Sequence, residues 1–281
     1  MKAESSPRGR RLRILITNDD GIQAPGLPIL ARCLADAGHD VVVAAPTEAH
    51  SGCGASIGSV SEAHRIRVDM VHLPGVEELT TCSVDSPPAF IVLAALQGMF
   101  GTPPDVVVTG PNAGFNLGPL VLHSGTLGAA VTAASKGVPA IALSTEKRAR
   151  FGYRSAGEFC ARHLHGLLDA MGPGVALNVN VPDLPSDRLA GVRQTRLSPH
   201  SLVAIVLHDD DAPGDGDVLR RMRIELDHDA DGSLHRQRRA GMQDPDDTDA
   251  GAIVDGFVSV TVMHGGLLHV DGRDVSAAWT A

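Results

Sequence analysis

The sequence predicts an α/β fold, with a Rossmann-like and mostly parallel sheet that carries helices on both faces. Near-continuous runs of Val, Ile and Leu indicate strands that are buried on both faces, as in parallel sheets. Helix-sized segments separate these runs, and polar loops containing Gly or Pro follow several of them. In open sheets of this kind, ligands bind outside the carboxyl ends of the strands. The loops that follow the apolar runs are therefore the first place to search for a functional site.

The expected elements alternate along the first two thirds of the chain. Strands are expected at residues 12–17, 40–46, 105–110, 140–143 and 175–181. Helices are expected at residues 27–37, 87–99, 125–136 and 155–171. This alternation predicts βαβ units, in which each helix connects two parallel strands.

The chain is expected to consist of a tail, a core and a C-terminal appendage. Residues 1–11 are basic but lack an apolar segment, and we expect them to be disordered. Residues 12–184 form the expected Rossmann-like catalytic core. Residues 185–281 are expected to form a β-hairpin arm and oligomerisation segment, which returns a strand near residues 256–263. In the expected arm, residues 201–208 and 218–226 flank an acidic turn, a pattern typical of a long hairpin.

Two adjacent carboxylates, Asp19 and Asp20, follow the first strand directly. Neighbouring aspartates repel each other, and partial burial makes the repulsion costlier, so a cation between them would account for the pair. A second interpretation stays open, in which Asn18 and Asp19 or Asp20 cap the helix that starts near Pro25.

Two further strand ends favour the metal site. The second strand runs into a polar loop that contains Ser51, and the third ends in a loop that contains Asn112. Because parallel strands place their carboxyl ends on one edge, Asp19, Asp20, Ser51 and Asn112 can converge. Carboxylate, hydroxyl and amide oxygens suit a hard divalent cation such as magnesium, manganese or calcium.

A helix with free backbone N–H groups is expected to begin on the same edge. Ser124 is a plausible N-cap, and Gly125 and Thr126 follow it in a segment of small residues. Such a helix start binds phosphate readily, although an ordinary capped helix fits the same pattern. Beside a metal site, we interpret it as a pocket for a phosphate ester.

Four segments together resemble the SurE family, the stationary-phase survival proteins: Thr17-Asn18-Asp19-Asp20-Gly21-Ile22, the loop of residues 45–52, Gly110-Pro111-Asn112-Ala113-Gly114-Phe115-Asn116-Leu117-Gly118 and His123-Ser124-Gly125-Thr126-Leu127-Gly128-Ala129-Ala130. The similarity continues through residues 137–144, 177–182, 193–196, 248–249 and 256–261. It covers most of the chain in the family's order.

The resemblance implies a metal-dependent 5′/3′-nucleotidase with one divalent ion per subunit, magnesium or manganese, with calcium as a substitute in a crystal. Its implied metal ligands are Asp19, Asp20, Ser51 and Asn112. Its implied phosphate contacts are Asn18, Asn116, Ser124, Gly125 and Thr126. It also implies a homodimer or homotetramer with exchanged C-terminal elements. The chain departs from the family pattern at residues 47–50, 85–89 and 220–241, which bears on the substrate range.

Composition narrows the class of protein. A net charge of −9, without a patch of Lys and Arg, argues against nucleic acid and membrane surfaces as partners and favours a small substrate. No stretch approaches the roughly 18 apolar residues of a membrane span. The four cysteines form no C-x-x-C pair, so we expect a reducing, cytoplasmic setting.

The resulting hypothesis is a 5′-nucleotidase-type phosphatase that hydrolyses nucleoside 5′- and 3′-monophosphates. Its expected catalytic residues are Asp19, Asp20, Asn116 and Ser124, with one aspartate available to accept the proton of the attacking water. Two alternatives stay open: a phosphatase for a biosynthetic ester, such as a sugar phosphate or modified nucleotide, and a non-enzymatic metal- or nucleotide-binding protein. His50 and His123 lie in the site loops, where a role in proton transfer is an open alternative. Cys53 is expected to be a packing residue.

Overall fold

The computed structural model describes residues 10–58, 65–147, 149–200, 204–209, 222–227 and 245–265, and it describes no side chains within 204–209 and 222–227. The tail before residue 10 and the acidic turn at residues 210–217 lie outside these ranges, so both expectations remain untested. Among the described helices, none combines the length and apolar composition that a bilayer crossing requires.

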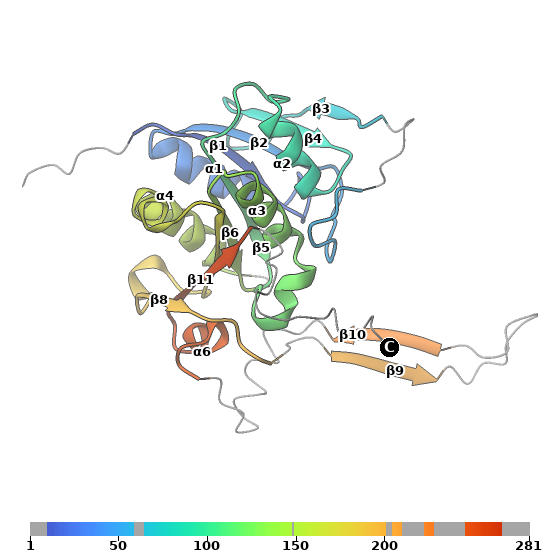
Figure 1. Ribbon diagram of the computed structural model, residues 1–281, viewed down its shortest axis with the longest axis vertical. Coiled ribbons are helices and arrows are strands. Elements are labelled where there is room, and N and C mark those ends of the chain that lie inside the picture. The colour runs from blue at the N-terminus through green and yellow to red at the C-terminus, as the bar shows by residue number, and fades with distance from the viewer. Residues whose placement is uncertain are drawn as a thin grey trace, which may run out of the picture.

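A nine-stranded sheet forms the centre of the molecule, in the order β3-β4-β2-β1-β5-β6-β7-β11-β8 (Figure 1). Its strands are β1 (Arg13–Thr17), β2 (Asp40–Pro46), β3 (Val68–Met70), β4 (Thr80–Val84), β5 (Val106–Ala113), β6 (Ala140–Thr145), β7 (Val175–Val181), β8 (Val192–Thr195) and β11 (Val258–His264). The six strands from β4 to β7 are parallel to their neighbours, whereas β3 and β11 pair antiparallel with β4 and β7. The predicted fold class is confirmed.

The direction of chain winding reverses between β1 and β5. From β1 the chain moves outward to β2 and β4, and it then returns to β5 and continues to β6 and β7 on the other side. Such a reversal is a topological switch point, where a crevice opens outside the carboxyl ends of the two strands. The ends of β1 and β5 carry Asp19, Asp20 and Asn112, so the fold itself places these residues at the expected ligand crevice.

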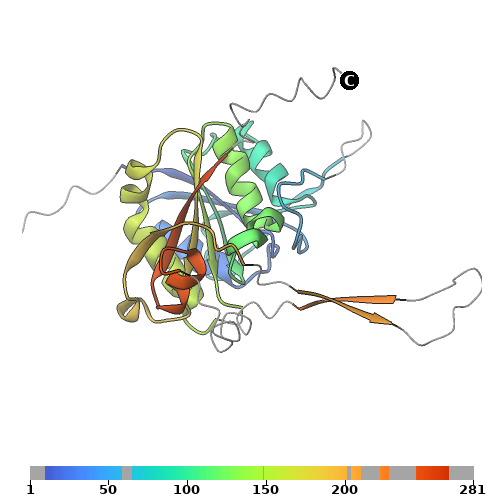
Figure 2. The ribbon, with the colours of Figure 1, turned by 60° about the horizontal axis from the view of Figure 1, so that its bottom comes forward.

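Helices cover both faces of the sheet (Figure 2). The helices are α1 (Gly26–Asp36), α2 (Pro88–Leu96), α3 (Gly125–Ser135), α4 (Gly152–Ala170) and α6 (Asp249–Val254), with single 3₁₀ segments η1 (Gly118–His123) and η2 (Ser186–Arg188). The core cluster on one face joins the sheet to α1 and α4, and that on the other joins it to α2 and α3. The four helices expected in the core are confirmed to within a few residues at each end.

The two faces differ in the size of their side chains. Within β1, Ile14 and Ile16 point toward α1 and α4, and Leu15 points toward α2 and α3, as strand alternation requires. Small residues dominate where α3 meets the sheet, namely Ala129, Ala130, Ala133, Ala140, Ala142 and Ala176. Because few bulky side chains separate them, α3 can lie close to the strands, and its first turn reaches the switch point.

The chain after residue 185 divides between the main sheet and a separate hairpin. The expected returning strand is confirmed as β11, which pairs with β7 and β8. The expected hairpin is also confirmed: β9 (Ala204–Asp209) and β10 (Met222–Asp227) are antiparallel, and they project away from the body in both views (Figures 1 and 2). The division of the chain into two units at residue 185 stays a prediction.

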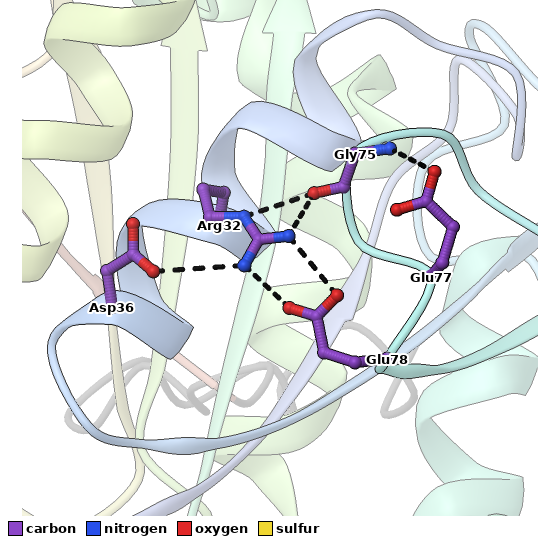
Figure 3. A network of polar contacts seen from close by, with 5 residues as sticks. All are labelled: Arg32, Asp36, Gly75, Glu77 and Glu78. Carbon is purple, nitrogen blue, oxygen red and sulfur yellow. Dashed lines mark hydrogen bonds and ion pairs between the residues drawn. The ribbon is translucent and has the colours of Figure 1, made fainter.

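A surface network attaches α1 to the segment between β3 and β4 (Figure 3). The Arg32 guanidinium donates to the Gly75 carbonyl at 3.0 Å and contacts a carboxylate oxygen of Glu78 at 2.6 Å. The Asp36 carboxylate lies 3.8 Å from the same side chain, and Glu77 accepts from the Gly75 amide. Because these ion pairs are exposed, water screens them, and their main effect is to orient the loop.

We predict that Gly128→Ala destabilises the protein although alanine is the better helix former. A Cβ at Gly128 would overlap the backbone of Gly54, in the loop that also carries Ser51. Separating two backbones in a packed core costs about 1–3 kcal/mol. Urea denaturation measures the change in the free energy of unfolding.

The matched control is Gly166→Ala in α4, where nothing lies within 4 Å of the added methyl group. This variant should be more stable than wild type by about 0.5–1 kcal/mol, since alanine loses less backbone entropy in a helix. Equal stabilisation in both variants would show that α3 does not press against the Ser51 loop.

Candidate functional site

The turn after β1 is held by the side chain of Asn18. Its amide nitrogen donates to the Gly21 carbonyl at 3.1 Å, and its amide oxygen accepts from the Gly21 amide at 3.1 Å. Helix α1 begins after Pro25 and has no side-chain cap. The alternative interpretation of Asn18, Asp19 and Asp20 as helix caps is therefore wrong, and another explanation is needed for the two carboxylates.

Asp19 is 4% exposed and lies against the first turn of α3. The Thr126 hydroxyl donates to its Oδ1, and the His50 amide donates to its backbone carbonyl at 2.7 Å. The pKa of Asp19 is raised to about 6, chiefly by burial and to a smaller extent by the charge of Asp20, against the opposing effect of hydrogen bonds from Thr126 and Gly125. Contacts within the protein thus offset only part of the free energy that it costs to bury the ionised carboxylate of Asp19.

Asp20 is held from the other side of the switch point. The Ala113 amide of β5 donates to its Oδ2 at 2.9 Å. Burial also raises the pKa of Asp20, and the Ala113 hydrogen bond and the positive charge of Lys147 act against that rise. Two adjacent carboxylates with raised pKa values, next to one another at a strand end, are a functional feature more often than a structural one.

The same contacts bring the four expected metal ligands onto adjoining segments. Ser51 follows His50, whose amide bonds Asp19, and Asn112 precedes Ala113, whose amide bonds Asp20. The Asn112 side-chain nitrogen donates to the Gly114 carbonyl at 2.8 Å, so its amide oxygen is the atom that can act as a ligand. The Ser51 side chain is exposed.

This donor set fits a hard divalent cation. It offers two carboxylates, a hydroxyl and an amide oxygen, and a cation would compensate the charge that burial penalises. Within the described residues, no three His, Cys, Asp or Glu side chains are grouped to hold a metal. The described residues therefore form no site for a soft metal at this position. A hard cation would complete its coordination shell with neutral oxygen atoms and water.

The start of α3 adjoins these carboxylates. Ser124 is the N-cap of α3, and its hydroxyl oxygen accepts from the Leu127 amide at 3.0 Å. A Cβ at Gly125 would lie 2.7 Å from the Cβ of Asp19, so only glycine allows this approach. The Thr126 side chain is fully buried and its hydroxyl is used on Asp19. The Thr126 side chain therefore orients Asp19, and the contact of Thr126 with a phosphate stays a prediction.

Asn116 is buried at the end of the β5 loop, in a polar network that sequence reasoning missed. Its side-chain nitrogen donates to the Ser144 hydroxyl at 2.8 Å. Its backbone carbonyl accepts from Asn178 at 2.8 Å and Asn180 at 3.0 Å, and its amide donates to Asn180 at 2.9 Å. The sequence did contain a signal of this network, since two asparagines alternate with apolar residues in strand β7. Buried side-chain amides require hydrogen-bond partners, so a polar neighbour could have been expected there.

Other polar groups border the site. The half-buried Tyr153 has a raised pKa, through burial and then the charge of Asp20, and its ring packs beside Gly26. Burial, followed by the charge of Asp19, raises the pKa of Cys53 to about 11, so this thiol is no thiolate nucleophile at neutral pH. His123 is exposed, and its carbonyl accepts from the Gly54 amide.

Comparisons with known proteins identify relatives along nearly the whole chain. The family model described as survival protein SurE matches residues 14–203. A protein named 5′-nucleotidase SurE from Syntrophobacter fumaroxidans is 33% identical over 270 residues, which cover 95% of this chain and 99% of that protein. One of the same name from Desulfitobacterium hafniense is 35% identical over 259 residues, covering 91% and 92%.

A solved structure shares the fold. The crystal structure of the SurE protein from Aquifex aeolicus superimposes with a TM-score of 0.70 and 26% sequence identity, and the match covers 91% of this chain and 94% of that one. The overall fold of this chain is thus one that has been observed by experiment in a protein that it resembles.

The burial of Asp19 predicts how the stability of the metal-free protein depends on pH. Its folded pKa of about 6 exceeds the ordinary value of 3.8, so its ionisation destabilises the folded state. The penalty is negligible below about pH 4, grows between pH 4 and pH 6, and levels off above pH 6 at up to about 3 kcal/mol. Asp19→Asn lacks this titration, so its advantage over wild type in the free energy of unfolding should grow between pH 4 and 7.

Urea denaturation at several pH values, with a chelator present, measures this advantage. Saturating Mn²⁺ is the control, since a cation favours the ionised carboxylate and should abolish the penalty in wild type only. An advantage that stays constant from pH 4 to 7 would mean that Asp19 is not desolvated in the folded state.

Proposed function

The chain belongs to the SurE family, and from that premise we propose that it is a divalent-metal-dependent phosphomonoesterase that hydrolyses nucleoside 5′- and 3′-monophosphates. Relatives that cover nearly all of this chain bear the name 5′-nucleotidase. The observation that carries the proposal is the pair of buried carboxylates, Asp19 and Asp20, beside the start of α3 at the switch point. A cation site and a helix start together suit a phosphate ester.

The metal ligands of the proposal are Asp19, Asp20, Ser51 and Asn112, and one ion, Mg²⁺ or Mn²⁺, binds per subunit. When bound, the ion supplies Lewis-acid polarisation of the phosphoryl group and of the attacking water. The contacts of Asp19 with His50 and of Asp20 with Ala113 support this set, since they bring the β1, β2 and β5 loops together.

Asp19 or Asp20 accepts the proton that the attacking water releases. The Thr126 hydroxyl orients Asp19, and the Ala113 amide orients Asp20. Both carboxylates therefore start from a fixed geometry.

The phosphoryl group is bound by the Ser124 hydroxyl, the backbone N–H groups of Gly125 and Thr126, and the Asn116 amide, with the Gly125 N–H shared with the Asp19 carboxylate. Preorganised donors of this kind stabilise charge on the transferring group without reorganisation. The capping bond of Ser124 to Leu127 leaves the hydroxyl hydrogen available as a donor. Asn18 is included as a predicted phosphate contact, although its side chain already holds the turn at Gly21.

A second candidate function is a phosphatase for a biosynthetic ester, such as a sugar phosphate or modified nucleotide. The unusual segment at residues 47–50 favours it, because this segment adjoins the carboxylates through the bond from His50 to Asp19. Phosphate release from a panel of nucleoside and sugar phosphates, with Mn²⁺ or Mg²⁺, separates the two. If the protein hydrolyses no phosphomonoester, the remaining alternative is a non-enzymatic metal- or nucleotide-binding protein.

The proposal includes a homodimer or homotetramer in a reducing, cytoplasmic setting. The four cysteines are all free, which suits reducing conditions. The hairpin of β9 and β10 projects from the body, and a second chain is the partner that we propose to cover it (Figure 2).

We predict that Asp20→Asn weakens Mn²⁺ binding and lowers turnover by two or more orders of magnitude, because it removes an anionic ligand. Titration calorimetry measures the metal affinity, and phosphate release measures the turnover. The fold should survive, since loss of a carboxylate relieves repulsion at Asp19.

Asn116→Ala is the matched variant on the phosphate side of the site. It should lower turnover about tenfold or more and leave Mn²⁺ affinity within about twofold of wild type, since Asn116 contacts the phosphoryl group and not the ion. Equal loss of metal affinity in the two variants would contradict the division into metal and phosphate sites.

Deletion of residues 201–226 should convert the oligomer into monomers or aggregate, because the hairpin then no longer pairs with a second chain. Analytical ultracentrifugation at micromolar concentration measures the association, and Mn²⁺ binding reports whether the core remains folded. A full-length protein that sediments as a monomer would refute the proposed assembly.

A further inference from the structure

Asp249, the first residue of α6, is a fully buried carboxylate outside the proposed metal and phosphate contacts. Its Oδ2 accepts from the Gly118 amide at 2.9 Å. Its Oδ1 accepts from the amides of Ser198 at 2.7 Å and Ala250 at 2.8 Å. One side chain therefore joins three segments that are far apart in sequence.

Gly118 connects this carboxylate to the phosphate side of the site. It lies two residues after Asn116 and has a φ of +51°. A Cβ at Gly118 would come within 2.7 Å of the His200 carbonyl oxygen and 2.8 Å of that of Ser198. The turn at residues 116–118 thus packs backbone to backbone against the segment that leads toward β9.

Capping of α6 does not explain Asp249. The N-cap of this helix is Thr248, whose side chain accepts from the Gly251 amide at 3.1 Å. A fully buried carboxylate is costly unless several donors compensate it. Of the three backbone N–H groups that bond it within the described residues, two belong to segments outside α6, so the carboxylate attaches those segments to the helix.

We infer that Asp249 is a positioning residue for the phosphate-binding turn, an inference that rests on the proposed function. Asn178 and Asn180 hold the backbone of Asn116 from β7, and Asp249 holds Gly118 two residues later. The turn is therefore fixed at both of its ends. Loss of the second attachment releases the Gly118 end of the turn, so Asn116 is held less tightly in the position in which it meets a phosphoryl group.

The test is Asp249→Asn, which keeps the shape of the side chain and replaces an acceptor by a donor. If the amide oxygen stays on Ser198 and Ala250, the new NH₂ group faces the Gly118 amide and that bond is lost. We expect the dissociation constant for inorganic phosphate, measured with saturating Mn²⁺, to rise about tenfold, a loss typical of a hydrogen bond to a charged group. Mn²⁺ affinity should stay within about twofold, and hydrogen exchange at the Gly118 amide should accelerate.

Two neighbouring variants control for general destabilisation. Thr248→Ala removes the cap of α6, and Asp247→Asn removes the exposed ion pair with Arg196. Both should retain wild-type phosphate affinity. Phosphate binding that weakens equally in Thr248→Ala would overturn the inference, because the effect would then follow the stability of α6 and not the bond to Gly118.

The outcomes separate this inference from the proposed function. Wild-type protein that binds no phosphate and hydrolyses no ester would overturn the proposed function, and the inference with it. Unchanged phosphate affinity in Asp249→Asn, with an active wild type, would overturn the inference alone. If Asp249→Asn does not fold, Asp249→Glu tests the same contact, because it keeps the charge and moves the carboxylate away from the Gly118 amide by one methylene group. Unchanged phosphate affinity in that variant would equally overturn the inference.

Discussion

The burial of Asp19 against the first turn of α3 is the constraint on which the rest of the site depends. The carboxylate can approach α3 only because Gly125 lacks a side chain, and its desolvation raises its pKa to about 6. The hydroxyl of Thr126 compensates part of the lost hydration. The desolvation cost that remains is the reason that a cation is favoured there. The close approach of Asp19 and α3 also requires small residues along the face of α3, so that the helix can lie close to the sheet.

A layer of buried polar groups supports the turn that carries Asn116, the proposed phosphate contact. Ser144, Asn178 and Asn180 reach Asn116 from β6 and β7, and Asp249 reaches Gly118 from α6. Each of these groups would be costly to bury alone, and the network satisfies most of their polar atoms, although the Asn178 Oδ1 has no hydrogen-bond partner among the described residues. The return of the C-terminal segment into the main sheet as β11 therefore does more than extend the sheet, since it brings α6 to the turn that Asn116 begins.

Sequence patterns were reliable where one physical property dominated. Runs of Val and Ile in β1, β2 and β5 predicted buried parallel strands, and Ser124 predicted the start of α3. The short strands β3, β4 and β8 were not anticipated. The buried strand β4 is rich in hydroxyl groups, and β8 lies at the sheet edge with mostly polar side chains, so neither carries the apolar run that marks a core strand.

The sequence by itself determined the fold class, the strand ends that carry the candidate ligands and the family, because these depend on local periodicity and on ordered motifs. Only the tertiary structure decided which partner each polar group takes. Thr126 bonds a residue 107 positions away and Asp249 one 131 positions away, and no local pattern specifies such a pair. The same holds for the pKa of Asp19, because burial, its largest cause, is a property of the packed molecule and not of the turn in which the residue lies.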